Sequence, residues 1–298
     1  MKKIAQIIPY FGRWPEWIEL YLYSCSRNPM VDFILYTDCP TENFPEYGNV
    51  RFVKMTLPEY CRLVSERLGM DYAIKNTYKL TDLKPFLGAV HKPELEGYDF
   101  WSFGDLDLCY GNLSMVLNDK NLDRFDLITT HCYHIAGHLT VLRNNEYYRN
   151  LCFDVQDWQH RLTDDTHHGF DEGEWSGLVY PKLRIGRALW KYGFKYVPGL
   201  RFFSFMNCYN RIADRKQLFK EYYTSPAPKP GETWTYALNT NEVEAPDGRR
   251  LPYIHFLFFK KTPWFETERY WRDGYYGIDG QIERYKTIQF SLAGIKGV

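Results

Sequence analysis

One stretch, Tyr98 to Gly111 (YDFWSFGDLDLCYG), constrains the chain most, because it joins an apolar segment to two closely spaced carboxylates. Three aromatic residues in its first half favour an extended strand. Asp105 and Asp107 follow with one residue between them, so in extended chain both point to one face, about 6–7 Å apart at their Cα atoms. Two like charges this close favour a cation beside them. The stretch indicates a divalent-metal site at the end of a buried strand; a pair of solvated turn aspartates is the alternative.

Composition limits the class of protein. The 298 residues are enough for one large α/β domain. Because 37 basic residues balance 37 acidic ones, the chain has no net charge that would attract nucleic acid. Seven cysteines without paired spacing argue against a disulfide framework. The N-terminal apolar run is too short for a signal peptide, and no segment is long enough for a transmembrane span. We expect a cytoplasmic protein, with peripheral contact at the inner face of the membrane left open by its aromatic and basic tail.

Predicted strands alternate with predicted helices along the first half of the chain. The strands are expected at 4–9, 32–37 and 50–55, and helices at 14–24, 58–68 and 146–162. This alternation predicts an α/β fold with a mainly parallel, Rossmann-like sheet flanked by helices. Ligands of such sheets bind beyond the carboxyl ends of the strands. The loop after the first strand, with Pro9, Tyr10 and Phe11, is therefore a candidate binding loop.

Segment 75–90 precedes the acidic strand and is rich in charged residues. Its residues 81–85 look like the start of a helix, with Pro85 tolerated in the first turn. Lys79, Asp82 and Lys84 could contact a phosphate and a nucleoside. A solvated polar face remains the alternative.

Together these features resemble a known family. The segment YKLTDLKP at 78–85, the strand YDFWSFGDLD at 98–107 and Gly111 are similar to bacterial glycosyltransferases of the GT-A fold, of the kind that build capsular polysaccharide and lipopolysaccharide glycans. The resemblance covers the first two-thirds of the chain. It implies that Asp105 and Asp107 bind Mn²⁺ (or Mg²⁺) together with the diphosphate of a nucleotide sugar, a UDP-sugar being favoured. It also places Lys79, Asp82 and Lys84 at the donor, and implies a glycan acceptor, lipid-linked acceptors included.

Residues 131–138 hold the densest group of histidines in the chain. A zinc site is not favoured, because the group lacks the HExxH pattern and has no cysteine pair nearby. In the resembled family a glycine-containing loop before a strand borders the acceptor. Gly137 and His138 are therefore candidate acceptor-binding residues.

A polar loop at 163–177 carries several titratable groups between glycines. A catalytic loop and a merely solvated loop are the two interpretations of this segment. A base for an inverting reaction must reach the acceptor hydroxyl, and Asp171 or Glu172 is preferred over Glu174 for that role. Trp175 could stack on the ring of a sugar.

The last third carries a proline-rich linker and a turn signal. Residues 234–239 and 251–259 flank Asp247-Gly248, which predicts a hairpin. His255 lies among apolar residues and could be an ordinary core histidine. In the resembled family a late histidine completes the metal shell and a following basic residue meets the diphosphate. That implies metal binding by His255 and donor binding by Lys260 or Lys261.

We therefore expect one glycosyltransferase domain over residues 1–298. Residues 1–130 would bind metal and nucleotide sugar, 131–223 the acceptor, and 224–298 would form a hairpin and tail that close the site. The predicted function is metal-dependent transfer of a sugar to a hydroxyl acceptor. A metal-dependent phosphoester hydrolase and a catalytically silent carbohydrate-binding protein of the same fold are the alternatives.

Overall fold

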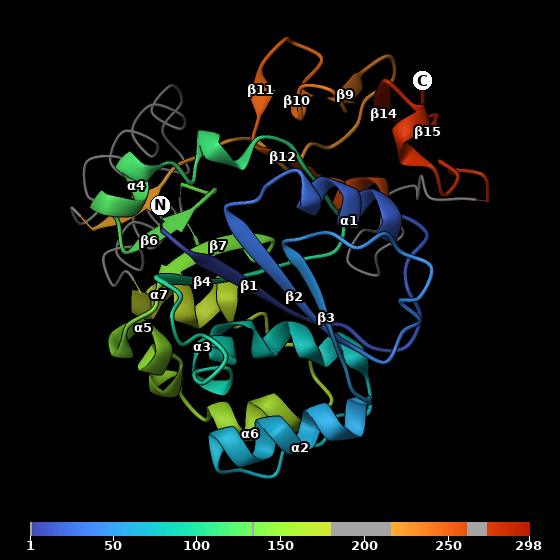
Figure 1. The fold of residues 1–298 in the computed structure, drawn as a ribbon. Coiled ribbons are helices and arrows are strands. Elements are labelled where there is room, and N and C mark those ends of the chain that lie inside the picture. Colours follow the sequence, from blue (N-terminus) through green and yellow to red (C-terminus); the bar gives the residue numbers. More distant parts are fainter. Residues whose placement is uncertain (1, 133, 180–215, 261–272) are drawn as a thin grey trace, which may run out of the picture.

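A seven-stranded sheet lies at the centre of the computed structural model, which describes residues 2–132, 134–179, 216–260 and 273–298 (Figure 1). Its strands in spatial order are β3 (Val50–Lys54), β2 (Val31–Thr37), β1 (Ile4–Pro9), β4 (Phe100–Gly104), β7 (Leu139–Arg143), β6 (Leu127–Thr129) and β8 (Gln217–Phe219). Strands β3, β2, β1 and β4 are parallel, β7 is antiparallel to both of its neighbours, and β6 and β8 are parallel. All strands except β7 therefore end at one edge. The predicted α/β fold with a mainly parallel sheet is confirmed.

The inner strands of the sheet carry apolar side chains on both faces. Strand β1 reads IAQIIP and β2 reads VDFILYT, and nearly all of these side chains are buried. Parallel strands covered on both faces have this continuous apolar character. The observed bounds agree with the predicted strands 4–9, 32–37 and 50–55 to within one residue at each end.

Helix α2 (Leu57–Leu68) has clear signals at both ends. The Thr56 side chain accepts from the Glu59 N–H, the Glu59 side chain accepts from the Thr56 N–H, and Gly69 ends the helix with a φ of 63°. These are a capping box and a left-handed C-terminal glycine. They explain why the predicted helix 58–68 is confirmed.

Three other predicted helices differ from the structure. Helix α1 (Ile18–Ser26) begins after residue 14, because the Trp14 ring stacks on Tyr10 and its Nε1 donates to the Pro40 carbonyl. The 3₁₀ helix η1 (Thr77–Phe86) begins before residue 81, because the Asn76 side chain caps it. Residues 146–162 form three short helices, and Asp157 between them has a φ of 53°, which an α-helix cannot contain. They are α5 (Glu146–Asn150), η3 (Leu151–Asp154) and α6 (Trp158–Thr163).

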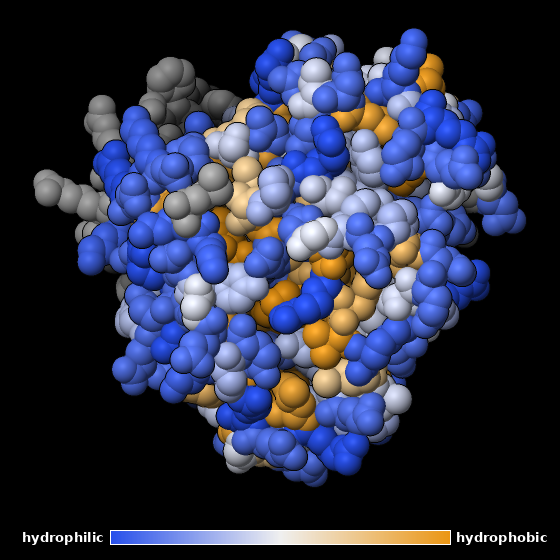
Figure 2. All heavy atoms as spheres, in the orientation of Figure 1, coloured by the Kyte–Doolittle hydropathy of each residue, from blue (hydrophilic) through white to orange (hydrophobic). Residues whose placement is uncertain are grey.

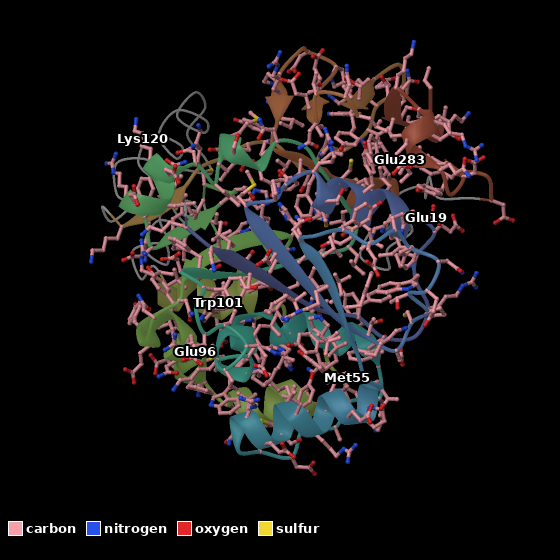
Figure 3. All side chains as sticks on the ribbon, viewed as in Figure 1. Glu19, Met55, Glu96, Trp101, Lys120 and Glu283 are labelled. Atoms are coloured by element: carbon pink, nitrogen blue, oxygen red, sulfur yellow. The ribbon has the colours of Figure 1, made fainter. Side chains whose placement is uncertain are left out.

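Helices cover both faces of the sheet (Figure 1). Helices α2, η1, α3 (Leu87–Val90), α5, η3 and α6 contribute to the apolar cluster on one face, which includes Trp101 of β4. Figure 3 labels this residue below the strands. Helix α1, η2 (Leu113–Met115) and α4 (Asp119–Arg124) pack against the other face. The central strands are thus buried from both sides, which fixes the edge where they end.

A second sheet covers the outer side of α1. Its strands in spatial order are β11 (Arg250–Leu251), β10 (Glu242–Glu244), β9 (Thr233–Ala237), β14 (Thr287–Ser291), β15 (Gly294–Gly297) and β13 (Tyr276–Gly277). Leu20 of α1 shares an apolar cluster with this sheet, while Tyr21 shares the cluster of the large sheet. Helix α1 therefore connects the two layers.

The predicted hairpin is wrong in its pairing. Strand β9 pairs with β10 through a turn in which Asn241 has a φ of 55°, and Asp247-Gly248 joins β10 to the short β11. Residues beyond β11 leave this sheet and form β12 (Tyr253–His255), which pairs antiparallel with β5 (Leu108–Tyr110). A turn sequence shows where the chain reverses, but the strand that a segment joins depends on distant residues.

The visible surface is mostly hydrophilic, with apolar residues showing toward the middle of the face in Figure 2. Throughout the described ranges, every helix is too short or too polar to cross a membrane.

The end of β4 leaves no space for a side chain at Gly104. A Cβ atom there would lie 2.9 Å from the His138 carbonyl oxygen and against the Gln6 amide. We expect Gly104→Ala to lower the free energy of unfolding by about 1–3 kcal/mol, as overpacking does. Gly48→Ala is the control, since its Cβ would meet nothing within 4 Å. Equal urea midpoints for the two variants would contradict this prediction.

Candidate metal centre and active site

The carboxyl edge of the large sheet gathers the sequence-predicted site. Asp105 and Asp107 follow β4. Because β7 runs the opposite way, the residues that precede it, Gly137 and His138, lie at the same edge. The segment after β8 reaches this edge too, where the His255 N–H donates to the Thr224 carbonyl. Segments far apart in the chain therefore meet at one place.

Asp105, Asp107 and His255 form a cluster that could hold a metal ion. Each offers one ligand atom, and these atoms all lie within 4.8 Å of one another. Nε2 of His255 lies 3.3 Å from Oδ2 of Asp107, and both residues are buried. Two carboxylate oxygens and one imidazole nitrogen fit a divalent cation such as Mn²⁺. The acidic pair and the late histidine, predicted to share a site, do lie together.

The pairing of β5 with β12 brings His255 to the acidic pair. His255 is opposite Leu108 in this ladder, and the Phe256 N–H donates to the Asp107 carbonyl over 3.0 Å. Ser225 Oγ lies 2.8 Å from Nδ1 of His255, which leaves Nε2 directed at Asp107. A partner on the far ring nitrogen commonly orients a metal-binding histidine.

The His138 ring supports His255 from one side. The two rings stack with centroids 4.4 Å apart at 26°. Burial, helped by the neighbouring histidines, holds the pKa of His138 well below its usual range. His138 is therefore neutral at physiological pH and adds no charge to the cluster.

Two lysines neutralise the acidic pair. Nζ of Lys84 lies 2.5 Å from Oδ1 of Asp105, and Nζ of Lys260 lies 2.6 Å from Oδ2 of Asp107. Burial alone would raise the pKa of Asp107, but Lys260 and His255 hold it well below its usual range. Each carboxylate is thus paired with an ammonium group. Lys261, the other predicted donor-binding lysine, lies outside the described residues.

A second carboxylate pair lies on the other side of Lys84. Asp171 and Glu172 begin the short helical turn η4 (Asp171–Trp175), and Oδ2 of Asp171 is 3.7 Å from Nζ of Lys84. The Gly137 N–H donates to Glu172, and a Cβ on Gly137 would lie 2.5 Å from Oδ2 of Asp171. Burial and the Glu172 charge, opposed by Lys84, raise the pKa of Asp171 to about 6. The predicted base candidates therefore adjoin the metal cluster through one shared lysine.

Lys79 and Asp82 are buried and bind protein groups. Asp82 accepts from the N–H groups of His168 and Gly169 at 2.8–3.1 Å, and its carboxylate lies 3.1 Å from Nζ of Lys79. Lys79 also donates to the Asp164 carboxylate and to two carbonyls of the same region. These contacts fasten the segment before Asp171 to η1. Donor binding by Lys79 and Asp82 stays a prediction.

Trp175 has no open face for a sugar. Its side chain is fully buried, with its ring 5.9 Å from that of Phe103. The expectation of a stacking surface is corrected, because the indole fills the core beneath the site. The following helix is α7 (Ser176–Val179).

Tyr78 is an aromatic residue near the centre that sequence reasoning did not select. It is 43 % exposed. Its partial burial is the larger cause and the Asp105 charge the next cause that raise the pKa of its hydroxyl to about 12. In the sequence, Tyr78 looks like an ordinary surface tyrosine at the start of a helix.

The loop after β1 lies at the same edge as the cluster. Tyr10 stacks on Trp14, Phe11 packs against Tyr60, and the Gly12 N–H donates to Asp38 of the neighbouring loop. Donor binding by Pro9, Tyr10 and Phe11 stays a prediction.

Two residues that hold the centre were also missed. Ser225 contacts His255, as described above. Trp17 donates from Nε1 to the Leu106 carbonyl between the two aspartates, and its ring lies 5.1 Å from Nζ of Lys260. No local pattern marks either residue, because each acts only through tertiary contacts.

The histidine group at 131–138 forms no separate metal centre among the described residues. His131 lies 3.1 Å from Glu221, and its ring contacts those of His134 and His138. Through His138 these ring contacts extend to His255.

The fold and the cluster define an α/β protein with a candidate divalent-metal centre at the carboxyl edge of its sheet. The chain belongs to a family of unknown function, DUF6625, whose model matches residues 6–283. No curated protein matches its sequence. Two solved structures of the glycosyltransferase GlyE from Streptococcus pneumoniae TIGR4 are similar. One aligns over 67 % of this chain with 14 % sequence identity and a TM-score of 0.34. The apo form aligns over 68 % of this chain with 13 % sequence identity and a TM-score of 0.33. The chain spans 52 % of each.

We expect Asp107→Asn to lose Mn²⁺ binding in isothermal calorimetry while the protein stays folded, since the amide keeps the shape but removes a charged ligand. Asp165→Asn is the control, because that carboxylate is 77 % exposed and forms an ion pair with Lys75. Mn²⁺ affinity equal in the two variants would show that Asp107 is not a ligand.

Proposed function

We propose that this protein is a metal-dependent glycosyltransferase that moves a sugar from a nucleoside-diphosphate sugar, with UDP favoured, to a hydroxyl of a glycan acceptor. The observation that carries the proposal is the joint site of Asp105, Asp107 and His255 with Lys84 and Lys260. It combines ligands for a cation with two ammonium groups that suit a diphosphate. A separate carboxylate, Asp171, lies next to it.

The donor half is built to bind negative phosphate oxygens. A divalent cation held by the cluster would neutralise the charge that grows on the departing diphosphate. The imidazole of His255 favours Mn²⁺ over Mg²⁺ at this site. Lys84 and Lys260 pair with the aspartates, and a bound diphosphate would offer both lysines new partners. These residues orient the donor and stabilise its leaving group.

The acceptor half centres on Asp171. A base must take the proton from the acceptor hydroxyl, and it works best with a pKa near the working pH. The pKa of Asp171, raised to about 6, meets this requirement. Oδ2 of Asp171 lies near Lys84, so the base would be positioned next to the donor sugar. Glu172 and Gly137 would border the acceptor, with His138 behind them.

The alternative hydrolase is less well supported. Two-metal phosphoester hydrolysis needs a second set of ligands about 4 Å from the first metal. Among the described residues only Asp105, Asp107 and His255 meet the geometry of a metal cluster. A single centre flanked by lysines agrees better with transfer from a diphosphate.

The biological role that follows is polysaccharide biosynthesis in the cytoplasm. A growing glycan, free or lipid-linked, is the acceptor class that the proposal requires, and a lipid-linked one would bring the protein to the inner face of the membrane. Residues 1–130 would then bind metal and donor, 131–223 the acceptor, and 224–298 would close the centre with His255 and Lys260.

The decisive assay measures release of nucleoside diphosphate from a panel of UDP-, GDP- and TDP-sugars with and without Mn²⁺. We expect Mn²⁺-dependent release from at least one donor, absent in Asp107→Asn. Release of inorganic phosphate from simple phosphomonoesters would instead favour the hydrolase. Tight donor binding without any turnover would favour a silent binding protein.

Lys260→Met should change two affinities in opposite directions. In the absence of nucleotide, the substitution removes the ammonium group that competes with Mn²⁺ at Asp107, so the affinity for Mn²⁺ should rise about tenfold. In the presence of Mn²⁺, the affinity for UDP should fall about tenfold, as expected for the loss of one charge-assisted hydrogen bond. Lys216→Met, at a lysine that is 73 % exposed, is the control. Calorimetry that shows both affinities falling together would remove Lys260 from the diphosphate site.

Asp171→Asn should lower kcat by about 10²–10⁴-fold while donor binding survives, as for loss of a general base. In the wild type, turnover should rise with pH up to about 6 and then level off, because the carboxylate must be deprotonated to accept a proton. The variant should lose this rise, and Glu174→Gln, on the same turn, should keep it. Unchanged turnover in Asp171→Asn would point to a retaining reaction, which needs no such base.

A further inference from the structure

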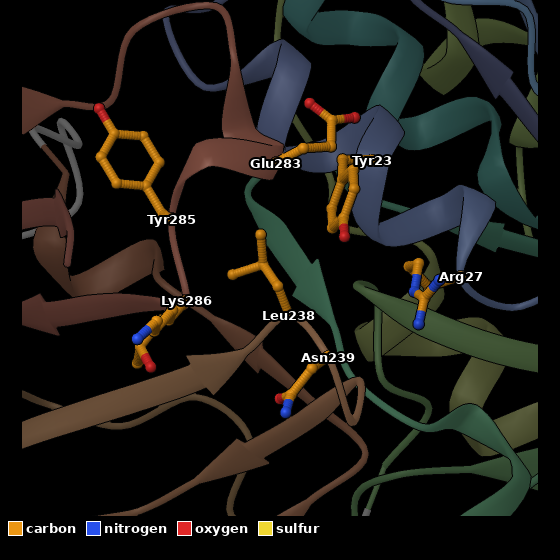
Figure 4. A pocket seen from close by; sticks show the side chains of 8 residues that line it. Tyr23, Arg27, Leu238, Asn239, Glu283, Tyr285 and Lys286 are labelled. Carbon is orange, nitrogen blue, oxygen red and sulfur yellow. The ribbon is translucent and has the colours of Figure 1, made fainter.

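A hollow of about 620 Å³ lies between α1 and the second sheet (Figure 4). Cavities of roughly 300–1,000 Å³ are the usual size of small-molecule sites. Leu238 forms its apolar floor. Thr287 and six further residues surround this floor, and we call the six the groove residues: Tyr23, Arg27, Asn239, Glu283, Tyr285 and Lys286.

Helix α1 separates this hollow from the metal centre. Trp17, at the start of α1, contacts Leu106 and Lys260. Tyr23 lies in its last turns and Arg27 just after its end. At 1.5 Å per residue, the distance along the helix from Trp17 to Arg27 is about 15 Å. The two sites are therefore distinct but lie along one rigid element.

The two tyrosines of the groove are held in place. The Tyr285 ring lies against the backbone of Gly297, where any side chain would collide with it, and its hydroxyl lies 3.4 Å from Asp279. Tyr23 is half-buried against the second sheet, and burial raises the pKa of its hydroxyl, which stays protonated. Fixed aromatic rings with polar edges suit the apolar faces and hydroxyls of sugars.

The charged groove residues are exposed to solvent. In the described part of the chain, no ion pair or side-chain hydrogen bond is formed by Arg27, Glu283 or Lys286. Glu283, which lines the hollow, would repel a phosphate, and the short apolar floor gives little for a lipid. Donors and acceptors of both signs around a small floor match a ligand with many hydroxyl groups.

We propose that the groove residues form a second, non-catalytic binding site for a neutral oligosaccharide. The site would hold a distant part of a glycan chain whose end is elsewhere on the protein. The inference goes beyond the proposed transfer reaction and does not need it, because the groove and the metal centre share no residue.

The test uses the full-length protein on an array of immobilised neutral oligosaccharides, followed by calorimetry with the strongest ligand. Glu283→Gln and Asn239→Ala change exposed side chains, so both should fold, and each should weaken binding at least tenfold. Tyr285→Ala should abolish it. Tyr147→Ala, at a tyrosine that is 55 % exposed elsewhere, is the matched control and should bind as the wild type does.

Asp107→Asn separates this inference from the proposed function. We expect it to keep the oligosaccharide affinity, while the groove variants keep Mn²⁺-dependent release of nucleoside diphosphate. Absence of binding to every oligosaccharide on the array would overturn the inference. So would binding that is lost in Asp107→Asn or that survives all three groove variants, since the glycan would then be bound elsewhere.

Discussion

The short ladder between β5 and β12 is the contact on which the candidate centre depends. It joins the strand after the acidic pair to a strand near the end of the chain, and so carries His255 and Lys260 to Asp107. A buried carboxylate without a countercharge is strongly unfavourable. Without this ladder Asp107 would have to gain a proton or reach water, and either change would end metal binding at the site.

Charge balance at the centre connects its parts. Each aspartate of the pair has its own lysine, and Lys84 also faces Asp171 and the Gly137 carbonyl. A divalent cation entering such a site adds positive charge to a cluster that is already neutralised, whereas a cation together with a diphosphate does not. This balance favours binding of a metal and an anionic ligand together, and it makes Lys84 the residue that connects Asp105 to Asp171.

Helix η1 supports the site in two ways. Its last turns present Lys84, while Lys79 and Asp82 fasten the segment that leads to Asp171. In the sequence these three charged residues looked alike, and all three were predicted to bind the donor. Their contacts distinguish them, because Lys84 pairs with Asp105 of the candidate centre, whereas Asp82 accepts from the N–H groups of His168 and Gly169.

The sequence by itself determined the features that depend on neighbouring residues: apolar strands β1, β2 and β4, helix α2 with its caps, and the carboxylate pair at a strand end. It also indicated His255, but through a family resemblance. Only the tertiary structure decided that residues 253–255 pair with β5, that Trp175 is a core residue, and that Ser225 and Trp17 hold the centre. Strand propensity and capping act over a few residues, whereas strand partners and burial arise from contacts between segments far apart in the chain.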